Sequence, residues 1–273
     1  MTADARSETA GARKAGVLGS PIAHSKSPQL HLAAYRALGL DNWTYDRIEC
    51  TAEQLQSTVS GFGPEWVGVS VTMPCKFAAL HFADERSMRA ELVGSANTLV
   101  HTADGWRADN TDVAGVVGAL GDVGGDVVIV GAGGTARAAV VAVAELGARR
   151  ATIVARDSAK AEPLLTLAAT VGVDAHWRAF TDPALVDDVA TAAATINTVP
   201  ADAGAQHVSA LNRTPVLLDA IYDPWPTPLA AAVVVEGGRV IGGLQMLLHQ
   251  AYAQVELFTG QRAPKEAMAA ALR

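Results

Sequence analysis

The sequence predicts an α/β protein of two domains, one of them built on a doubly wound parallel sheet. The chain has 273 residues, which is more than one domain usually contains. Short runs of β-branched residues alternate with Ala- and Leu-rich segments along most of it, as parallel strands joined by crossover helices do. A glycine-rich turn also stands between an apolar strand and a helix in the second half. Together these features indicate two α/β units in succession.

The first unit is expected to contain five strands and several short helices. Apolar or β-branched runs predict strands at 15–19, 43–49, 66–71, 96–100 and 106–108. Helices are expected at 28–38, 52–60, 76–82 and after 112. Ser27 before Pro28 predicts an N-cap followed by Pro at the first helical position. Thr51 and Gln54, three residues apart, predict a capping box for the second helix.

The second unit opens with a strand that should be buried on both faces. The apolar run at 127–130 is followed by a glycine turn, by an apolar helix to Leu146 and by a second buried strand at 151–154. Further strands are expected at 194–196, 215–220 and 239–242, and a long amphipathic helix at 244–260. This order of strand, helix and strand predicts a parallel sheet.

Composition and charge exclude several classes of protein. The net charge is −7 and there is no basic run, so no nucleic-acid partner is expected and an anionic substrate must be captured locally. No apolar stretch has the roughly 18 to 20 residues needed to span a bilayer. Residues 1–14 are polar and should form a frayed tail, not a secretory signal. These features predict a cytoplasmic protein, monomer or homodimer, that binds a small molecule and no membrane. Cys50 and Cys75 should be reduced, and no spacing suggests a metal site.

The glycine-rich turn predicts a dinucleotide site of the Rossmann type. A pyrophosphate is doubly anionic and sits against backbone N–H groups at a helix N-terminus, which requires a turn free of Cβ atoms. Ala136 takes the third position of the usual glycine pattern, where a small residue lets the helix pack on the strand. The residues expected to contact the cofactor here are Gly131, Ala132, Gly133, Gly134, Thr135 and Ala136.

The end of the next strand indicates which dinucleotide binds. NAD requires an acidic residue for its ribose hydroxyls, and NADP requires a cation for its 2′-phosphate. Arg156 lies 25 residues beyond Gly131, where this residue is expected, and Lys160 adds a second positive charge. Asp157 could accept from ribose in an NAD enzyme or cap the following helix. The two cations favour NADP.

Ser25 and Ser27 predict an anion site at the start of the first helix. Two hydroxyl groups and the helix dipole at one N-terminus would together bind a carboxylate. The same serine could also cap the helix, and the two roles are compatible.

The chain resembles the shikimate dehydrogenase family from about Ala15 to Gly260. Its motifs stand in the family's order, at 21–28, 70–76, 95–98, 109–112, 131–136, 196–198, 219–222 and 243–250. The resemblance implies an enzyme that reduces the ketone of 3-dehydroshikimate to a hydroxyl with NADPH, in aromatic amino acid biosynthesis. It also implies a substrate domain made of 1–111 plus 244–273, a cofactor domain made of 112–243, and an active site in the cleft between them.

The resemblance also implies a role for each site residue. Lys76 and Asp112 form the catalytic pair, in which Lys76 assists at the carbonyl oxygen while Asp112 orients Lys76 and the substrate. Ser25 and Ser27 hold the substrate carboxylate. The other implied contacts are Thr72, Asn97 and Gln250 with ring hydroxyls, Tyr222 near the substrate, and Ala220 and Gly243 with the cofactor.

Other functions use similar patterns. The closest alternative is an NAD-dependent quinate/shikimate dehydrogenase, which Asp157 would suit. A methyltransferase also uses a glycine loop, but Arg156 stands where an acidic residue would be expected. A non-catalytic dinucleotide-binding regulator would not need both Lys76 and Asp112. The chain departs from the family pattern at Ser70, Ala155, Asp157 and Gln245.

Overall fold

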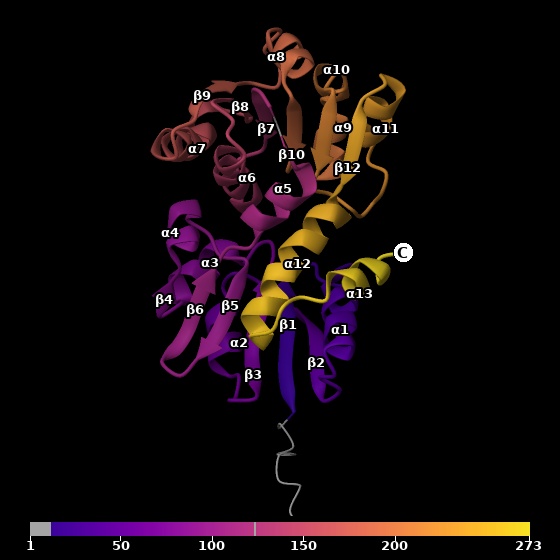
Figure 1. Ribbon diagram of the computed structural model, residues 1–273. Helices are drawn as coiled ribbons and strands as arrows, with labels where there is room; N and C mark the ends of the chain where they lie inside the picture. The colour runs from indigo at the N-terminus through magenta and orange to yellow at the C-terminus, as the bar shows by residue number, and fades with distance from the viewer. Residues whose placement is uncertain (1–11, 123) are drawn as a thin grey trace, which may run out of the picture.

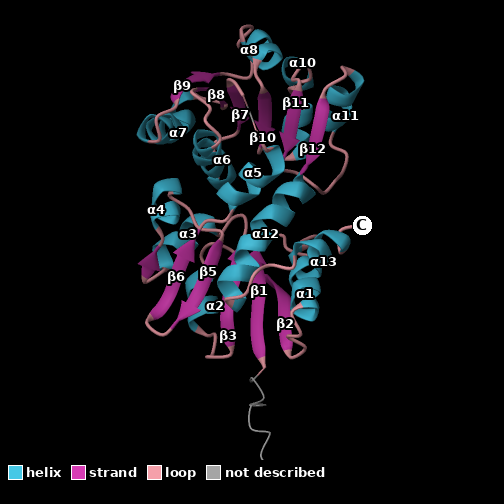
Figure 2. Cartoon of the chain, in the orientation of Figure 1, coloured by secondary structure: helices cyan, strands magenta, loops and turns pink. Residues whose placement is uncertain are grey.

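Two six-stranded sheets, each flanked by helices, make up the computed structural model, which describes residues 12–122 and 124–273 (Figures 1 and 2). Residues 1–11, which form most of the predicted N-terminal tail, lie outside the described residues. Arg13 and Lys14, also assigned to the tail, belong instead to the first strand. The prediction of two α/β units is confirmed.

The first sheet is mixed, not parallel throughout as predicted. Its strand order is β2-β1-β3-β5-β6-β4, and β5 runs antiparallel to both β3 and β6. The residues between β5 and β6 form a tight turn, which is too short for a parallel crossover. The predicted strand at 96–100 begins two residues later, and β4 was not predicted. The strands are β1 (Arg13–Gly19), β2 (Trp43–Glu49), β3 (Trp66–Val71), β4 (Glu85–Arg86), β5 (Thr98–Thr102) and β6 (Gly105–Asp109).

Both predicted helix caps in the first unit are wrong in position. Ser27 is the first residue of α1, and the cap position belongs to Lys26, which makes no side-chain cap bond. Gln54 takes the cap position of α2, where its Oε1 accepts from the Thr51 N–H at 3.0 Å. One of the two hydrogen bonds of the capping box, that from the Thr51 N–H to the Gln54 side chain, therefore forms, but it lies one turn before the start of α2. The helices are α1 (Ser27–Ala37), α2 (Leu55–Ser60), α3 (Lys76–Phe82) and α4 (Met88–Val93).

The second sheet is wholly parallel, as predicted, in the order β12-β11-β10-β7-β8-β9. From β7 the strand order runs outward to β8 and β9 on one side and to β10, β11 and β12 on the other. The boundary between β7 and β10 is therefore the switch point of a doubly wound fold. The strands are β7 (Val127–Val130), β8 (Arg150–Val154), β9 (Asp174–Arg178), β10 (Ala194–Asn197), β11 (Val216–Asp219) and β12 (Arg239–Gly242). The helices are α6 (Gly134–Glu145), α7 (Ser158–Thr170), α8 (Leu185–Thr191), α9 (Ala201–Ala205), α10 (Val208–Leu211) and α11 (Pro228–Val235).

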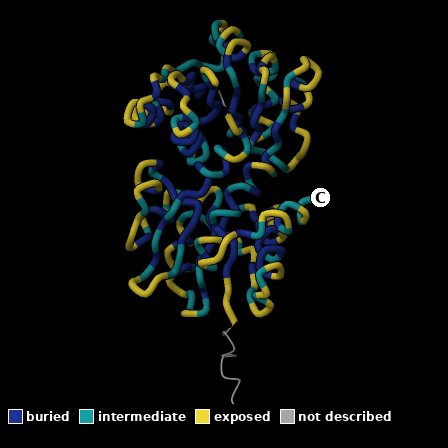
Figure 3. The backbone as a smooth tube through the Cα atoms, in the orientation of Figure 1, coloured by how far each residue is buried: buried dark blue, intermediate teal, exposed yellow. Residues whose placement is uncertain are grey.

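Two helices join the sheets, α5 (Asp112–Leu120) and α12 (Gly243–Thr259), and α13 (Lys265–Ala270) packs on α1. Helix α5 packs between α12 and α6 (Figure 1). Met246 of α12 lies in the core beside the second sheet, while Val255 and Phe258 lie in the core of the first. Buried segments therefore continue through the middle of the molecule (Figure 3). Within the described residues, no helix combines the length and apolar character needed to cross a membrane.

Candidate active site

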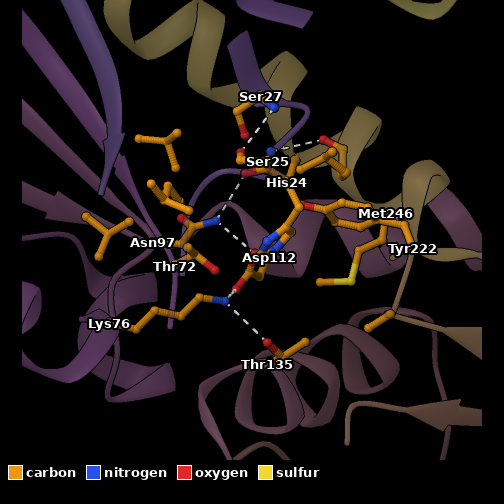
Figure 4. Close-up of a pocket in the computed structure, with 17 residues that line it drawn as sticks. His24, Ser25, Ser27, Thr72, Lys76, Asn97, Asp112, Thr135, Tyr222 and Met246 are labelled. Atoms are coloured by element: carbon orange, nitrogen blue, oxygen red, sulfur yellow. Dashed lines mark hydrogen bonds and ion pairs between the residues drawn. The ribbon is translucent and has the colours of Figure 1, made fainter. Parts of the chain in front are cut away.

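A pocket of about 150 Å³ lies between the two sheets, at the edge where their strands end. Both halves of the chain line it. All eight residues predicted to act in catalysis or to bind substrate meet there, and Figure 4 shows most of them pointing into one space. They are Ser25, Ser27, Thr72, Lys76, Asn97, Asp112, Tyr222 and Gln250.

Lys76 and Asp112 form an ion pair at the floor of this pocket. Each is the first residue of its helix, Lys76 of α3 and Asp112 of α5. The Lys76 Nζ lies 2.5 Å from Asp112 Oδ2, and the side chains are only 14% and 8% exposed. Nζ also donates to the Thr135 hydroxyl at 3.2 Å. An ammonium group has three N–H bonds, so one remains for a ligand.

Asn97 holds the other oxygen of the Asp112 carboxylate. The Asn97 Nδ2 donates to Asp112 Oδ1 at 2.9 Å, and the Asn97 Oδ1 accepts from the Thr111 N–H at 2.8 Å. These two contacts fix the orientation of the amide group. Thr111 in turn donates to Gln250 Oε1 at 3.2 Å. Thr111 was not among the predicted site residues, although it stands within the motif at 109–112.

Hydroxyl groups gather at the opposite end of the pocket. Ser25 and Ser27 are buried, and the Ser25 Oγ accepts from the Ser27 N–H at 3.3 Å. Burial raises the pKa of Tyr222, and hydrogen bonds with the Ser25 side chain and the Lys26 backbone oppose this shift. Tyr222 is therefore a neutral phenol at physiological pH. Three neutral hydroxyl groups that converge in this way suit a carboxylate.

A buried polar network behind the serines escaped the sequence analysis. Tyr45 donates to Ser70 at 2.6 Å, and Ser70 donates to Gln254 Oε1 at 2.8 Å. The Gln254 Nε2 donates to Thr98 Oγ1 at 2.9 Å, which ties the network to the strand beside Asn97. His31 contacts the same Gln254 oxygen at 3.3 Å, and burial lowers its pKa to about 3. No single local pattern connects these residues, since they belong to five separate elements.

The glycine-rich turn lines a second cavity of about 420 Å³, together with Arg156 and Lys160. Gly131 has φ +118°, and a Cβ there would overlap the Thr198 hydroxyl, so only glycine fits. Gly133 faces open space, and α6 begins at the next residue. A helix N-terminus beside an open, Cβ-free surface suits the phosphates of a dinucleotide.

Three of the other predicted cofactor residues line the first pocket, while Gly134 and Ala136 line neither cavity. Thr135, Ala220 and Gly243 line the first pocket, and a Cβ on Gly243 would overlap the Ala220 carbonyl. Ala136 is fully buried. Gln245, where the chain departs from the family pattern, is exposed and lies outside the lining of that pocket.

Asp157 caps α7, which is one of the two roles that the sequence left open. Its Oδ1 accepts from the Lys160 N–H at 3.0 Å. Arg156 and Lys160 are exposed beside it. The carboxylate that could have served an NAD ribose is thus engaged in the cap, while both cations face the cavity.

The described residues contain no cluster of three His, Cys, Asp or Glu side chains that could hold a metal. Cys50 and Cys75 are buried thiols, and the Cys75 Sγ donates to the Cys50 carbonyl at 3.1 Å. Burial raises the pKa of Cys75 to about 12, so this thiol beside Lys76 stays protonated.

Two family models match the chain. Residues 17–99 match the shikimate dehydrogenase substrate binding domain, and residues 243–273 match the shikimate 5′-dehydrogenase C-terminal domain. The chain is 34% identical over 272 residues to the shikimate dehydrogenase (NADP(+)) of Microcystis aeruginosa, with 94% of this chain and 95% of that protein covered.

Solved structures give the same result. The crystal structure of Mycobacterium tuberculosis shikimate dehydrogenase has a TM-score of 0.92 and 65% identity, covering 95% of this chain and 98% of that one. A shikimate 5-dehydrogenase of Listeria monocytogenes, solved in complex with shikimate and NAD, has a TM-score of 0.84 and 26% identity, with 96% of each chain covered.

Proposed function

This chain belongs to the shikimate dehydrogenase family, and we propose that it reduces the ketone of 3-dehydroshikimate to the hydroxyl of shikimate with NADPH. The observation that carries the proposal is the Lys76–Asp112 ion pair, which lies between a hydroxyl-lined pocket and the glycine-rich turn. We assign 1–111 plus 244–273 to the substrate domain and 112–243 to the cofactor domain. We expect the protein to be cytoplasmic, because free thiols such as Cys50 and Cys75 stay reduced in that compartment. We also expect it to be a monomer or a homodimer.

In this proposal the substrate lies with its carboxylate at Ser25, Ser27 and Tyr222. Its ring hydroxyls contact Thr72, Asn97 and Gln250, all of which line the same pocket. Buried polar groups that match those hydroxyls reject analogues that lack them, because a donor or acceptor would be left unpaired.

The lysine supplies a proton where negative charge develops. Lys76 Nζ donates its remaining N–H to the carbonyl oxygen, polarises the ketone and protonates that oxygen as it becomes a hydroxyl. Asp112 keeps the lysine in position, and Asn97 fixes the Asp112 carboxylate by taking its second oxygen. The low exposure of both charges strengthens their interaction, since little water screens it.

The residues around the glycine turn fit a dinucleotide. Gly131 to Ala136 would hold the pyrophosphate, Arg156 and Lys160 the 2′-phosphate, and Ala220 and Gly243 the nicotinamide end. When bound, NADPH supplies the hydride for the ketone carbon. We favour NADP over NAD because Asp157 is engaged in capping α7 and two cations adjoin the cavity.

The test is a four-way assay of nicotinamide absorbance, with shikimate or quinate and NADP+ or NAD+. We expect rapid reduction of NADP+ when shikimate is the substrate, and no rapid reduction in the other three pairings. Preference for NAD+ or quinate would instead identify the alternative, an NAD-dependent quinate/shikimate dehydrogenase, and turnover in no pairing would favour a non-catalytic dinucleotide-binding protein.

A matched pair of variants tests the catalytic assignment. Lys76→Ala should lower kcat by roughly 10²- to 10⁴-fold, the usual contribution of a general acid. Lys14→Ala removes a lysine from an exposed ion pair with Glu65 and should leave kcat unchanged. Near-native turnover of Lys76→Ala would show that the assignment is wrong.

A further inference from the structure

Three side chains on one face of β2 hold the loop that carries the carboxylate serines. Tyr45, Arg47 and Glu49 alternate along the strand, and alternate residues of a strand point to the same side of the sheet. Strand β2 lies beside β1, with Val17 opposite Arg47 and Gly19 opposite Glu49. The loop that follows β1 therefore passes directly over this row.

Each of the three side chains binds a different part of that loop. Glu49 Oε1 accepts from the Ser20 hydroxyl at 2.6 Å, and its Oε2 accepts from the Ile22 N–H at 3.1 Å. The Arg47 guanidinium donates twice to the Ser25 carbonyl, from Nε at 2.9 Å and from Nη2 at 2.6 Å.

The third member, Tyr45, acts at the far end of the loop. Its hydroxyl group donates to Ser70, and burial raises its pKa while the Ser70 and Ser27 side chains oppose this shift, so Tyr45 also acts on Ser27. The row thus fixes the loop at its start, at Ser25 and at Ser27. Two hydroxyl groups bind a carboxylate more tightly when their spacing is already fixed, because a mobile loop would lose conformational entropy when the ligand binds.

Arg47 also brings a positive charge to the loop that carries the two serines. Its guanidinium binds a neutral carbonyl group, and no carboxylate among the described residues forms an ion pair with it. Burial is the main cause that raises the pKa of Tyr222, and among the weaker causes the Asp223 carboxylate raises it while the Arg47 charge lowers it, so both charges act at this end of the pocket. Lys76, which lines the pocket, is already paired with Asp112.

We propose that Arg47 is a positioning residue for the substrate carboxylate, which sets the Ser25–Ser27 loop by its two bonds to the Ser25 carbonyl and adds a positive charge beside this end of the pocket. This inference rests on the proposed function, because it takes the ligand to be a carboxylate. Its predicted effect is on substrate affinity, since Arg47 lies away from the Lys76–Asp112 pair.

The test compares Arg47→Gln and Arg47→Lys with a matched control, Arg13→Gln. Arg13 also donates to a backbone carbonyl, that of Pro64, but it lines a different cavity of the same sheet. Arg47→Gln should raise the KM for shikimate roughly tenfold to hundredfold, because a charged hydrogen bond and a local charge are lost together. Its kcat and its KM for NADP+ should stay within about threefold of the parent enzyme.

Arg47→Lys should recover part of the affinity, since the ammonium group restores the charge but not the two parallel donors. Arg13→Gln should leave every constant unchanged. The shikimate kcat/KM of the parent enzyme should fall with added salt, and that of Arg47→Gln should fall less.

Two results would overturn the inference. One is an Arg47→Gln enzyme whose KM for shikimate equals that of Arg13→Gln, and the other is a loss confined to kcat. The unchanged KM for NADP+ serves as the check that the variant is folded. A parent enzyme without shikimate turnover would overturn the proposed function itself, and an active parent with an unaffected Arg47→Gln would overturn only the role of Arg47.

Discussion

The buried histidine behind the pocket should make the stability of this protein depend on pH in a way that one substitution removes. His31 is fully buried, stacks on Tyr45 with ring centroids 4.1 Å apart, and contacts Gln254 through Nε2. Its Nδ1 has no partner among the described residues. Burial without a compensating charge lowers its pKa from 6.5 to about 3. We therefore expect His31→Gln, which keeps an N–H donor for Gln254 but cannot titrate, to flatten the pH dependence.

The size of the effect follows from proton linkage. Between pH 6.5 and about pH 3, the unfolded chain takes up a proton at His31 that the folded chain does not. Stability is therefore complete above pH 6.5 and is lost as the pH falls, by about 1.4 kcal/mol per unit. From pH 6.5 to pH 5 the loss is about 2 kcal/mol, a large part of the roughly 5 to 15 kcal/mol that stabilises a typical protein.

The assay is urea unfolding followed by circular dichroism between pH 8 and pH 5. The lost stacking contact should add a constant destabilisation of about 1 kcal/mol, which moves the whole His31→Gln profile down, whereas loss of the titrating group should flatten its slope between pH 6.5 and pH 5. The slope is therefore the diagnostic quantity. His81→Gln, at an exposed histidine, should reproduce the profile of the parent protein. Parallel profiles for the parent and His31→Gln would refute the reasoning.

Three further substitutions test the site. Asp112→Asn removes the charge that holds Lys76, so steady-state kinetics should show kcat reduced by roughly 10²-fold or more, and an unchanged kcat would contradict the role of the pair. Asp157→Ala removes the cap of α7 and should lower the free energy of unfolding by about 1 kcal/mol in urea titrations. It should leave the ratio of kcat/KM for NADP+ and NAD+ unaltered, and a changed ratio would return the carboxylate to a role in cofactor choice. Gly131→Ala forces a side chain into φ +118° against Thr198, so NADP+ titrations should show affinity reduced at least tenfold, and normal affinity would show that the turn tolerates a Cβ.

Much of the site could be predicted because its motifs stand at the ends of parallel strands. Thr72 follows β3, Gly131 follows β7 and Ala220 follows β11. Carboxyl ends of parallel strands meet at one edge of a sheet, so a local pattern after each strand is enough to bring the residues together. The buried runs of β7 and β10 also have the continuous apolar character that this sheet requires.

Asn97 was predicted through the family resemblance, and its place beside Asp112 shows what local patterns alone do not give. It precedes β5, which is the amino end of a strand, and it reaches Asp112 only because β5 runs antiparallel to β3. Strand direction depends on how the chain turns after Thr102, where the pair Asp104 and Gly105 is a hairpin signal that the sequence analysis did not use. The sequence analysis also missed β9, for a different reason. This strand lies at the edge of its sheet, and its mostly polar sequence lacks an apolar run.

The acidic composition of the chain does not oppose anionic ligands, because its charges act over short distances. Physiological salt screens exposed charges beyond about 8 Å, so a ligand in the cleft responds to its nearest neighbours and not to the net charge of −7. Cationic side chains stand near each place where the proposed ligands would carry or develop negative charge. Arg47 lies at the carboxylate end, Lys76 at the carbonyl oxygen, and Arg156 beside the cavity of the glycine turn. Each lies near the carboxyl end of a strand or the start of a helix, where backbone N–H groups also point outward. The fold therefore places positive charge near the sites where the proposed ligands need it, although the net charge of the chain is −7.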